Sequence, residues 1–358
     1  MSTPESTAVL DDASRADRHD LIVMGAVTLM LLALGWGVFA AVALVGRNDM
    51  GADGAFGIGL AATAFLLGVR HAFDPDHVAA IDNTTRKLVA DGRPSLTVGF
   101  WFALGHSTVV VTTVVLLTTG FGAFTAQFAR EDSPLHAVTV VWGPAVAGVF
   151  LVVIGLLNIE PFLALLRMRR RGRLGDAHAP AVDAALSRRG LLARALAPVS
   201  RRVDRPWKMY AVGVLFGLGF DTASTIALLV IGANAVATVP WFVVLAIPVL
   251  FTAGMVTFDA ANGAAMNGAY RWAHRRPGRR LGYNLVVTGL SVAVAFAVGL
   301  LSLSAAVAEI SGTDRGLLGV LGAVDLGDAG FMLVAVFGIT WAAVFAWSRA
   351  RAGVRDLP

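Results

Sequence analysis

The chain has 358 residues, of which 56% are hydrophobic and only 15% are charged. Soluble domains carry about 25% charged residues, so this composition excludes an ordinary soluble protein and indicates several membrane spans. The formal net charge is +5, but the arginines gather in the segments between apolar runs, which argues against nucleic-acid binding. There is no cysteine, which excludes disulfides and thiolate metal sites.

Eight apolar runs are each long enough to cross a bilayer, which takes about 20 residues. We therefore predict an all-α integral membrane protein with eight transmembrane helices, and we expect no removable signal peptide in the polar N-terminal tail, residues 1–20. The first four helices fill 21–158 and the last four fill 209–348, separated by a basic loop at 159–208 and followed by a tail at 349–358. The individual runs are 21–46, 55–80, 95–119, 136–158, 209–233, 239–265, 283–308 and 329–348.

The charges of the connecting segments predict the orientation. Segments 82–94, 159–208 and 270–282 are basic, and the second of them carries eleven arginines, whereas the alternate connections carry few. By the positive-inside rule both termini are then cytoplasmic, in a multi-pass protein of the cell membrane. The hydrophilic insertion 167–208 is expected to be a solvated loop with a surface helix that touches anionic lipid, the alternative being a regulatory or partner-binding role.

One stretch, RHAFDPDHVAAIDNTTRK at 70–87, places several ionisable side chains inside an apolar run. Burying an ionisable group at the membrane centre costs roughly 2.5–3.5 kcal/mol on insertion scales. Four such groups, His71, Asp74, Asp76 and His77, fall within seven positions, which favours a cation site over simple capping by polar residues at a helix end. Pro75 removes a backbone donor and predicts that the helix kinks or opens there.

Further polar groups lie inside other predicted spans. His106 is a candidate metal ligand or an interhelical hydrogen-bonding residue, and Gly105 before it lets another helix approach closely. Asp221 has no basic partner in its own span, which suggests a cation or proton site. Asp259, one helical turn before Asn262, is a candidate of the same kind, or a solvated group near the cytoplasmic end. Nitrogen and carboxylate donors together suit nickel, cobalt, zinc, iron or manganese, whereas magnesium and calcium prefer oxygen alone.

Two segments hint at internal symmetry. FLLGVRHAFD (65–74) and LFGLGFD (215–221) each place glycine before an aspartate, three spans apart and so in opposite orientation. This pattern predicts an inverted repeat with a broken second helix, as in many secondary transporters, although short glycine-rich matches also arise by chance.

Four motifs resemble those of the nickel/cobalt transporter family, the high-affinity nickel permeases. RHAFDPDH resembles the second-helix signature, with His71, Asp76 and His77 at its fixed positions and Asp74 at its additional aspartate. FWFALGHSTVV, LGFDTAS and GMVTFD are similar to the motifs of the third, fifth and sixth helices.

The resemblance implies uptake of Ni²⁺ or Co²⁺ through a site in the second helix, with contributions from His106, Asp221 and Asp259. The metal is then the transported substrate and no cofactor is expected. Two departures from the family pattern replace a carboxylate with a neutral side chain, at Thr225 and Asn262, and leave metal preference open.

The functions that compete are a secondary transporter, an exporter of related architecture and a membrane-embedded metalloenzyme. The chain has no P-loop, because no lysine follows a glycine, and so no ATPase subunit is required by the sequence. A zinc protease would need a motif such as H-E-x-x-H. We expect uptake of a divalent metal ion, which binds at the His/Asp site and leaves past Asp82 to the cytoplasm, with the lipid bilayer as the other partner and no nucleic acid.

Overall fold

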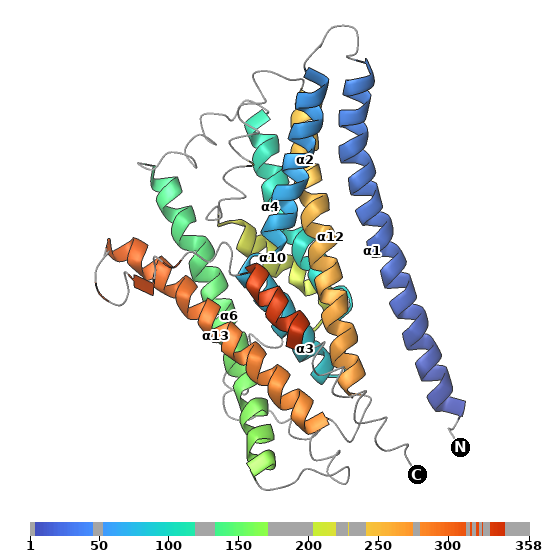
Figure 1. Cartoon of the computed structure of the whole chain (residues 1–358), viewed down its shortest axis with the longest axis vertical. Coiled ribbons are helices and arrows are strands. Elements are labelled where there is room, and N and C mark those ends of the chain that lie inside the picture. Colours follow the sequence, from blue (N-terminus) through green and yellow to red (C-terminus); the bar gives the residue numbers. More distant parts are fainter. Residues whose placement is uncertain are drawn as a thin grey trace.

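The computed structural model describes residues 4–45, 53–118, 133–170, 203–219, 228, 241–274, 280–312, 316, 320–321, 324 and 330–340. Within these ranges the regular structure is entirely helical (Figure 1), which confirms the predicted all-α fold. The helices are α1 (Pro4–Val45), α2 (Asp53–Ala72), α3 (Pro75–Ala90), α4 (Val98–Thr118), α6 (Pro134–Arg170), the 3₁₀ turn η3 (Pro206–Lys208), α10 (Met209–Gly217), α12 (Trp241–His274) and α13 (Arg280–Ser311). A further short helix covers Gly330–Thr340.

In the part of the chain that the structure describes, five helical segments are long and apolar enough to cross a membrane, namely Asp17–Val42, Val98–Leu116, Ala137–Arg170, Trp241–Arg271 and Leu285–Ser311. Two shorter apolar helices, Ile58–Ala72 and Gly330–Thr340, overlap the predicted second and eighth spans. The protein is therefore a multi-pass membrane protein, in which α1 leaves Ile22 and Leu29 exposed as expected for a lipid-facing helix. The total of eight spans and their sidedness stay predictions.

The helices form two groups with α3 between them (Figure 1). In one group α12 packs against α1, α2 and α4, and α4 also packs against α10. In the other group α6 and α13 cross and pack chiefly on each other. Since α3 contacts α12, α13, α6 and α4, it joins the two groups.

Gly105 permits the close packing of α4 against α10. A Cβ atom at this position would lie 2.0 Å from the carbonyl oxygen of Tyr210, far inside van der Waals contact. Only glycine therefore allows the two backbones to touch here, and the predicted close approach of another helix at Gly105 is confirmed.

The predicted second span is interrupted at Pro75. Helix α2 ends at Ala72, and α3 begins at Pro75, its first residue. Between them Asp74 is extended, with φ −61° and ψ 136°. A residue before proline is forced away from helical geometry, and proline suits the first position of a helix. The sequence therefore ends one helix and starts another, a complete break rather than a kink.

The start of α1 and the C-terminal ends of α3, α6 and α12 lie at one end of the molecule (Figure 1). There Arg271 of α12 pairs with Asp17 of α1, and Lys87 of α3 donates to the carbonyl oxygen of Val203 at 2.7 Å. These contacts fix the charged ends of the helices relative to one another.

The same end holds a small ion-pair cluster around Asp204. Its carboxylate accepts a hydrogen bond from Lys208 and pairs with Arg93 at 3.1 Å, and together they hold the pKa of Asp204 below its usual range. Asp204 thus anchors the segment before α10 to the connection after α3. The stretch 181–202, for which a surface helix is predicted, lies outside the described residues.

Candidate metal site

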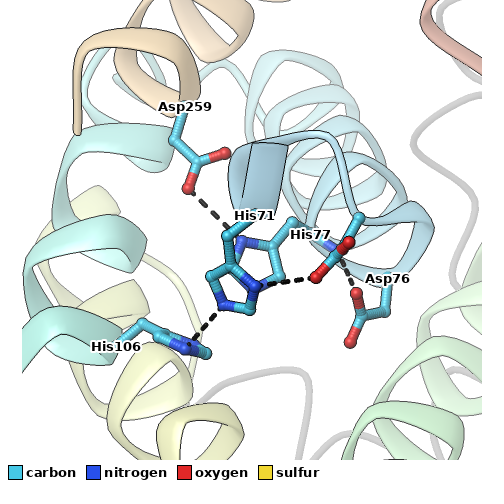
Figure 2. A network of polar contacts seen from close by, with 6 residues as sticks. His71, Asp76, His77, His106 and Asp259 are labelled. Carbon is cyan, nitrogen blue, oxygen red and sulfur yellow. Dashed lines mark hydrogen bonds and ion pairs between the residues drawn. The ribbon is translucent and has the colours of Figure 1, made fainter. Parts of the chain in front are cut away.

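Three histidines from three helices converge in the interior (Figure 2). His71 lies in the last turn of α2, His77 in the first turn of α3, and His106 in the middle of α4. Each offers one ligand atom, and the three ligand atoms all lie within 4.8 Å of one another. All three side chains are buried, with at most 3% of their surface exposed.

The spacing of two of the imidazole nitrogens fits two ligands of one metal ion. The Nε2 atoms of His71 and His106 are 2.9 Å apart. Imidazole binds zinc at about 2.1 Å, so two adjacent ligands at a right angle would stand about 3.0 Å apart. The three rings lie 4.6 to 4.9 Å from one another between centroids. The His71 and His106 nitrogens therefore match the spacing of two ligands of one ion, and the His77 ring lies beside this pair.

The break between α2 and α3 brings His71 and His77 together. In an unbroken helix, six residues rotate a side chain by about 600° and advance it by about 9 Å, so the two rings would point in different directions. Here Asp74 is extended and the ring centroids lie 4.6 Å apart. The break is therefore a condition for the site.

Two aspartates contact the other nitrogens of these histidines. The Oδ2 atom of Asp74 lies 2.7 Å from Nδ1 of His71, and the Oδ2 atom of Asp259, on α12, lies 3.4 Å from Nδ1 of His77 (Figure 2). A carboxylate on one ring nitrogen fixes the tautomer and leaves the other nitrogen free to bind metal. Asp74 and Asp259 are thus placed to orient the histidines.

Asp76 lies beside this group. Its Oδ1 atom accepts a hydrogen bond of 2.9 Å from the backbone N–H of His77, which is typical of an acid in the first turn of a helix. Asp74 and Asp76 are each partly exposed, in contrast to the three histidines. The two carboxylates therefore lie at the more exposed edge of the cluster.

Phenylalanines form the apolar walls around the imidazoles. Phe102 of α4 meets the His77 ring edge-on at 4.7 Å, and Phe251 of α12 lies 5.5 Å from the His71 ring. Phe216 of α10 packs on Phe102 at 5.2 Å. The phenylalanine side chains carry no hydrogen-bonding group of their own, so these walls cannot compete with the carboxylates for the ring nitrogens.

Asp259 reaches the site because α12 touches α4. A Cβ atom at Gly99 of α4 would lie 1.9 Å from the carbonyl oxygen of Asp259, so glycine is required at this contact. The Asp259 side chain is fully buried and therefore is not the solvated group that its position near the end of a span allowed. Asn262, one turn later, is only partly buried.

Of the seven candidate residues, six fall in this neighbourhood, and the seventh, Asp221, lies outside the described residues, as does Thr225. Sequence reasoning missed the pairing of His77 with Asp259, which are 182 residues apart. It also missed the phenylalanine walls. Their only signal in the sequence is the recurrence of phenylalanine near the polar residues of the spans.

A multi-pass helical bundle with a buried cluster of histidines and aspartates defines a membrane protein built to handle a transition-metal cation. The family model of the high-affinity nickel-transport proteins matches residues 57–346. The chain belongs to this family of nickel transporters, which are not enzymes and for which the metal is a substrate rather than a cofactor.

Several characterised relatives are similar along most of their length. The nickel transporter NicT of Mycobacterium tuberculosis is 44% identical over 338 residues, covering 94% of this chain and 91% of NicT. The high-affinity nickel-transport protein NixA of Helicobacter pylori is 41% identical over 293 residues, covering 80% and 86% respectively. The cobalt transport protein NhlF of Rhodococcus rhodochrous is 35% identical and covers 92% of each chain. No solved structure matches the chain.

Proposed function

We propose that the protein is a secondary transporter that takes up Ni²⁺, and also Co²⁺, across the cytoplasmic membrane through the histidine cluster. The observation that carries this proposal is the convergence of His71, His77 and His106 within 4.8 Å in a buried, cysteine-free interior. Borderline divalent metals favour imidazole ligands. The names of the relatives NicT, NixA and NhlF support nickel and cobalt as the substrates.

The histidines and the aspartates of the site have different roles. The three histidines bind the ion directly. Asp74 orients His71, and Asp259 orients His77, each through a contact with Nδ1 of the ring. Asp76 and Asp74 attract the cation on the exposed side and can add oxygen ligands. Asp221 contributes from the fifth span, as the family motif implies.

Binding of the ion requires a proton to move away from Nε2 of His106. If Nδ1–H of His71 faces the Asp74 carboxylate, Nε2 of His71 carries a lone pair, and Nε2 of His106 must donate to it across 2.9 Å. A metal between these two nitrogens needs both lone pairs, so the shared proton must leave Nε2 of His106, either to Nδ1 of the same ring or to solvent. The empty site thus holds a proton where the loaded site holds a metal.

The membrane potential supplies the driving force. A divalent cation that moves through 100 mV, inside negative, gains about 4.6 kcal/mol, twice the value for one charge. With both termini in the cytoplasm, the ion enters from outside, binds at the break between α2 and α3, and leaves past Asp82. It leaves toward the end where α3, α6 and α12 finish (Figure 1), called here the arginine-rich end because it carries Arg93, Arg170 and Arg271.

Single substitutions in α3 test this function. His77→Ala removes a ligand, and Asp76→Ala removes the carboxylate that holds the first turn of α3, so each is expected to abolish accumulation of radiolabelled nickel or cobalt in cells. Membrane expression, measured by immunoblot, should be unchanged. His19→Ala is the matched control, because His19 lies in α1 with its side chain 78% exposed.

Wild-type accumulation in both His77→Ala and Asp76→Ala would overturn the site assignment. Cells that express the wild-type protein and contain less metal than cells with an empty vector would instead show export.

A further inference from the structure

A second buried polar cluster lies further along α3, toward the arginine-rich end. Asp82 is five residues after His77, about 7.5 Å along the helix, and its side chain is completely buried. Arg86, one turn later, is only 7% exposed. Among the described residues, neither side chain forms a hydrogen bond or ion pair with the histidines, so we treat the two as a separate cluster.

Both charged side chains bond across to neighbouring helices. The hydroxyl of Tyr270, on α12, donates to Oδ1 of Asp82 and lies 3.4 Å from Oγ of Ser291 on α13. Arg86 donates from Nη1 to Oγ1 of Thr288, also on α13, at 3.4 Å. The charges of α3 thus connect it to α12 and α13.

Asn83 extends the cluster to α6. Its Nδ2 atom donates to the carbonyl oxygen of Ser291 at 3.4 Å, and its Oδ1 atom accepts from Asn158 of α6 at 3.0 Å. The polar face of α3 therefore ties the crossed pair α6 and α13 to the group that contains α12, in the same place where α3 lies between the two groups (Figure 1).

The two charged groups leave hydrogen-bonding capacity unused. Among the described residues, Oδ2 of Asp82 and the Nε and Nη2 atoms of Arg86 are buried without a hydrogen-bond partner, and no ion pair joins the two side chains within 4.0 Å. Buried charges that lack partners are costly. An acid four residues before a base on one helix is the favourable order for direct pairing. The free atoms are the ones that a direct pair would use.

We propose that Asp82 and Arg86 form a partner-exchange switch that closes the pathway between the metal site and the arginine-rich end. In the closed state each charge bonds across, Asp82 to Tyr270 of α12 and Arg86 to Thr288 of α13. In the open state the two charges pair with each other along α3. The crossed pair α6 and α13 is then free to move away from α12, and the ion can leave.

This inference rests on the proposed transport function, because a switch matters only if the metal must leave the site. It assigns the two charges a role apart from metal binding. A guanidinium beside Asp82 repels a divalent cation, which is why Asp82 serves the exit by changing partners rather than as a resting place for the ion. Metal binding by the histidines and opening of the switch can therefore be measured separately.

Two pairs of conservative variants separate the states. Asp82→Asn still accepts from Tyr270, and Arg86→Gln still donates to Thr288, but neither can form the ion pair. Both should keep the closed contacts and slow nickel uptake about tenfold or more. Tyr270→Phe and Thr288→Val remove a closed contact but leave the ion pair possible. Both should favour the open state.

The labelling rate of an introduced cysteine can report whether the switch is open or closed. The chain has no native cysteine, so only the introduced one reacts. Met266 is buried on α12, one turn before Tyr270, in an apolar cluster that includes Val287 of α13. In a Met266→Cys background, inside-out vesicles would be labelled with a membrane-impermeant maleimide. Relative to that background, labelling should become about tenfold faster with Tyr270→Phe and slower with Asp82→Asn or Arg86→Gln.

Ser95→Ala is the matched control, since it also removes a buried contact to α12, the 2.7 Å hydrogen bond from Ser95 to Asn267. It should change neither labelling nor uptake. Equilibrium binding of ⁶³Ni²⁺ to each purified variant is measured in parallel and should stay within about twofold of the background.

The proposal is overturned if Asp82→Asn and Arg86→Gln bind nickel normally and also transport it at the background rate. It is equally overturned if Tyr270→Phe and Asp82→Asn shift the labelling rate in the same direction. That result is expected if the polar contacts only hold the helices together. Loss of folding in one variant leaves the other member of its pair to decide. Absence of nickel binding by the unsubstituted protein would instead count against the proposed function.

Discussion

His71 and His77 each contact a carboxylate through Nδ1, and this contact sets what the other ring nitrogen can do. The Asp74 contact at 2.7 Å comes from the same chain break, whereas the Asp259 contact at 3.4 Å comes from a different helix. His106 has no hydrogen-bond partner at Nδ1 among the described residues. The three imidazoles therefore differ in how firmly they are oriented, although they share one centre.

Asp259→Asn tests whether this carboxylate orients His77. Removing the negative charge should weaken Ni²⁺ binding by the purified protein by about 10- to 100-fold, the usual effect of losing such a partner. X-ray absorption of the nickel-loaded variant at saturating metal should still show three imidazole ligands and an unchanged number of ligands in all.

Asp17→Asn is the matched control, because Asp17 also pairs with a basic side chain of α12, Arg271, but at the far end of that helix. Its nickel affinity should equal that of the wild type. A lower ligand count in Asp259→Asn would show that Asp259 binds the metal itself.

At the scale of elements, the site depends on a helix that stops and restarts. Asp74 cannot continue α2 because Pro75 follows it, and the restart places His77 in the first turn of α3. The first turn also exposes backbone N–H groups, and that of His77 donates a hydrogen bond to Asp76. A single proline therefore fixes the positions of all four polar side chains in this stretch.

Pro75→Ala should relieve the constraint on Asp74 and let α2 continue, which turns His77 away from His71. We expect the variant to reach the membrane but to bind Ni²⁺ roughly tenfold more weakly or worse, as titration of the purified protein would show. Pro144→Ala, in α6, replaces a proline within an uninterrupted helix and should leave affinity unchanged. Equal affinities for the two variants would contradict the role given to the break.

Much of this arrangement could be predicted from local sequence. The spacing of His71, Asp74 and His77 around Pro75 indicates both the break and a cation site. The pairing of His77 with Asp259 could not be predicted, because it joins residues 182 positions apart through helix packing. The hydrogen bond from Tyr270 to Asp82 could not be predicted from the sequence for the same reason. The role of Asp221 and the inverted repeat stay predictions.

At the scale of the whole molecule, the two helix groups meet at α3, which carries both His77 and Asp82. Movement of one group against the other would therefore act on the site and on the switch through one helix. Such movement needs no ATP if the ion runs down its electrical gradient. The energy of a divalent ion at 100 mV, about 4.6 kcal/mol, corresponds to an accumulation ratio on the order of a thousandfold.

Proteoliposomes test this driving force. With valinomycin and a potassium gradient that makes the interior negative, the initial rate of ⁶³Ni²⁺ uptake and the final accumulation should both rise. Valinomycin with equal potassium on both sides should bring the internal concentration only to the external one. Vesicles with His77→Ala protein correct for leakage. Identical accumulation under the two potassium conditions would rule out a voltage-driven mechanism.

The phenylalanine walls around the histidines have a consequence for the water that an ion carries. Phe102, Phe216 and Phe251 offer a hydrated ion nothing to replace its lost water, so it must exchange its shell for imidazole nitrogen and carboxylate oxygen to enter. Magnesium gives up water reluctantly and prefers oxygen ligands. Nickel and cobalt bind imidazole nitrogen favourably, which offsets the cost of losing water. If the ion binds at the histidines as proposed, the same walls would act as a dehydration filter against the most abundant divalent competitors.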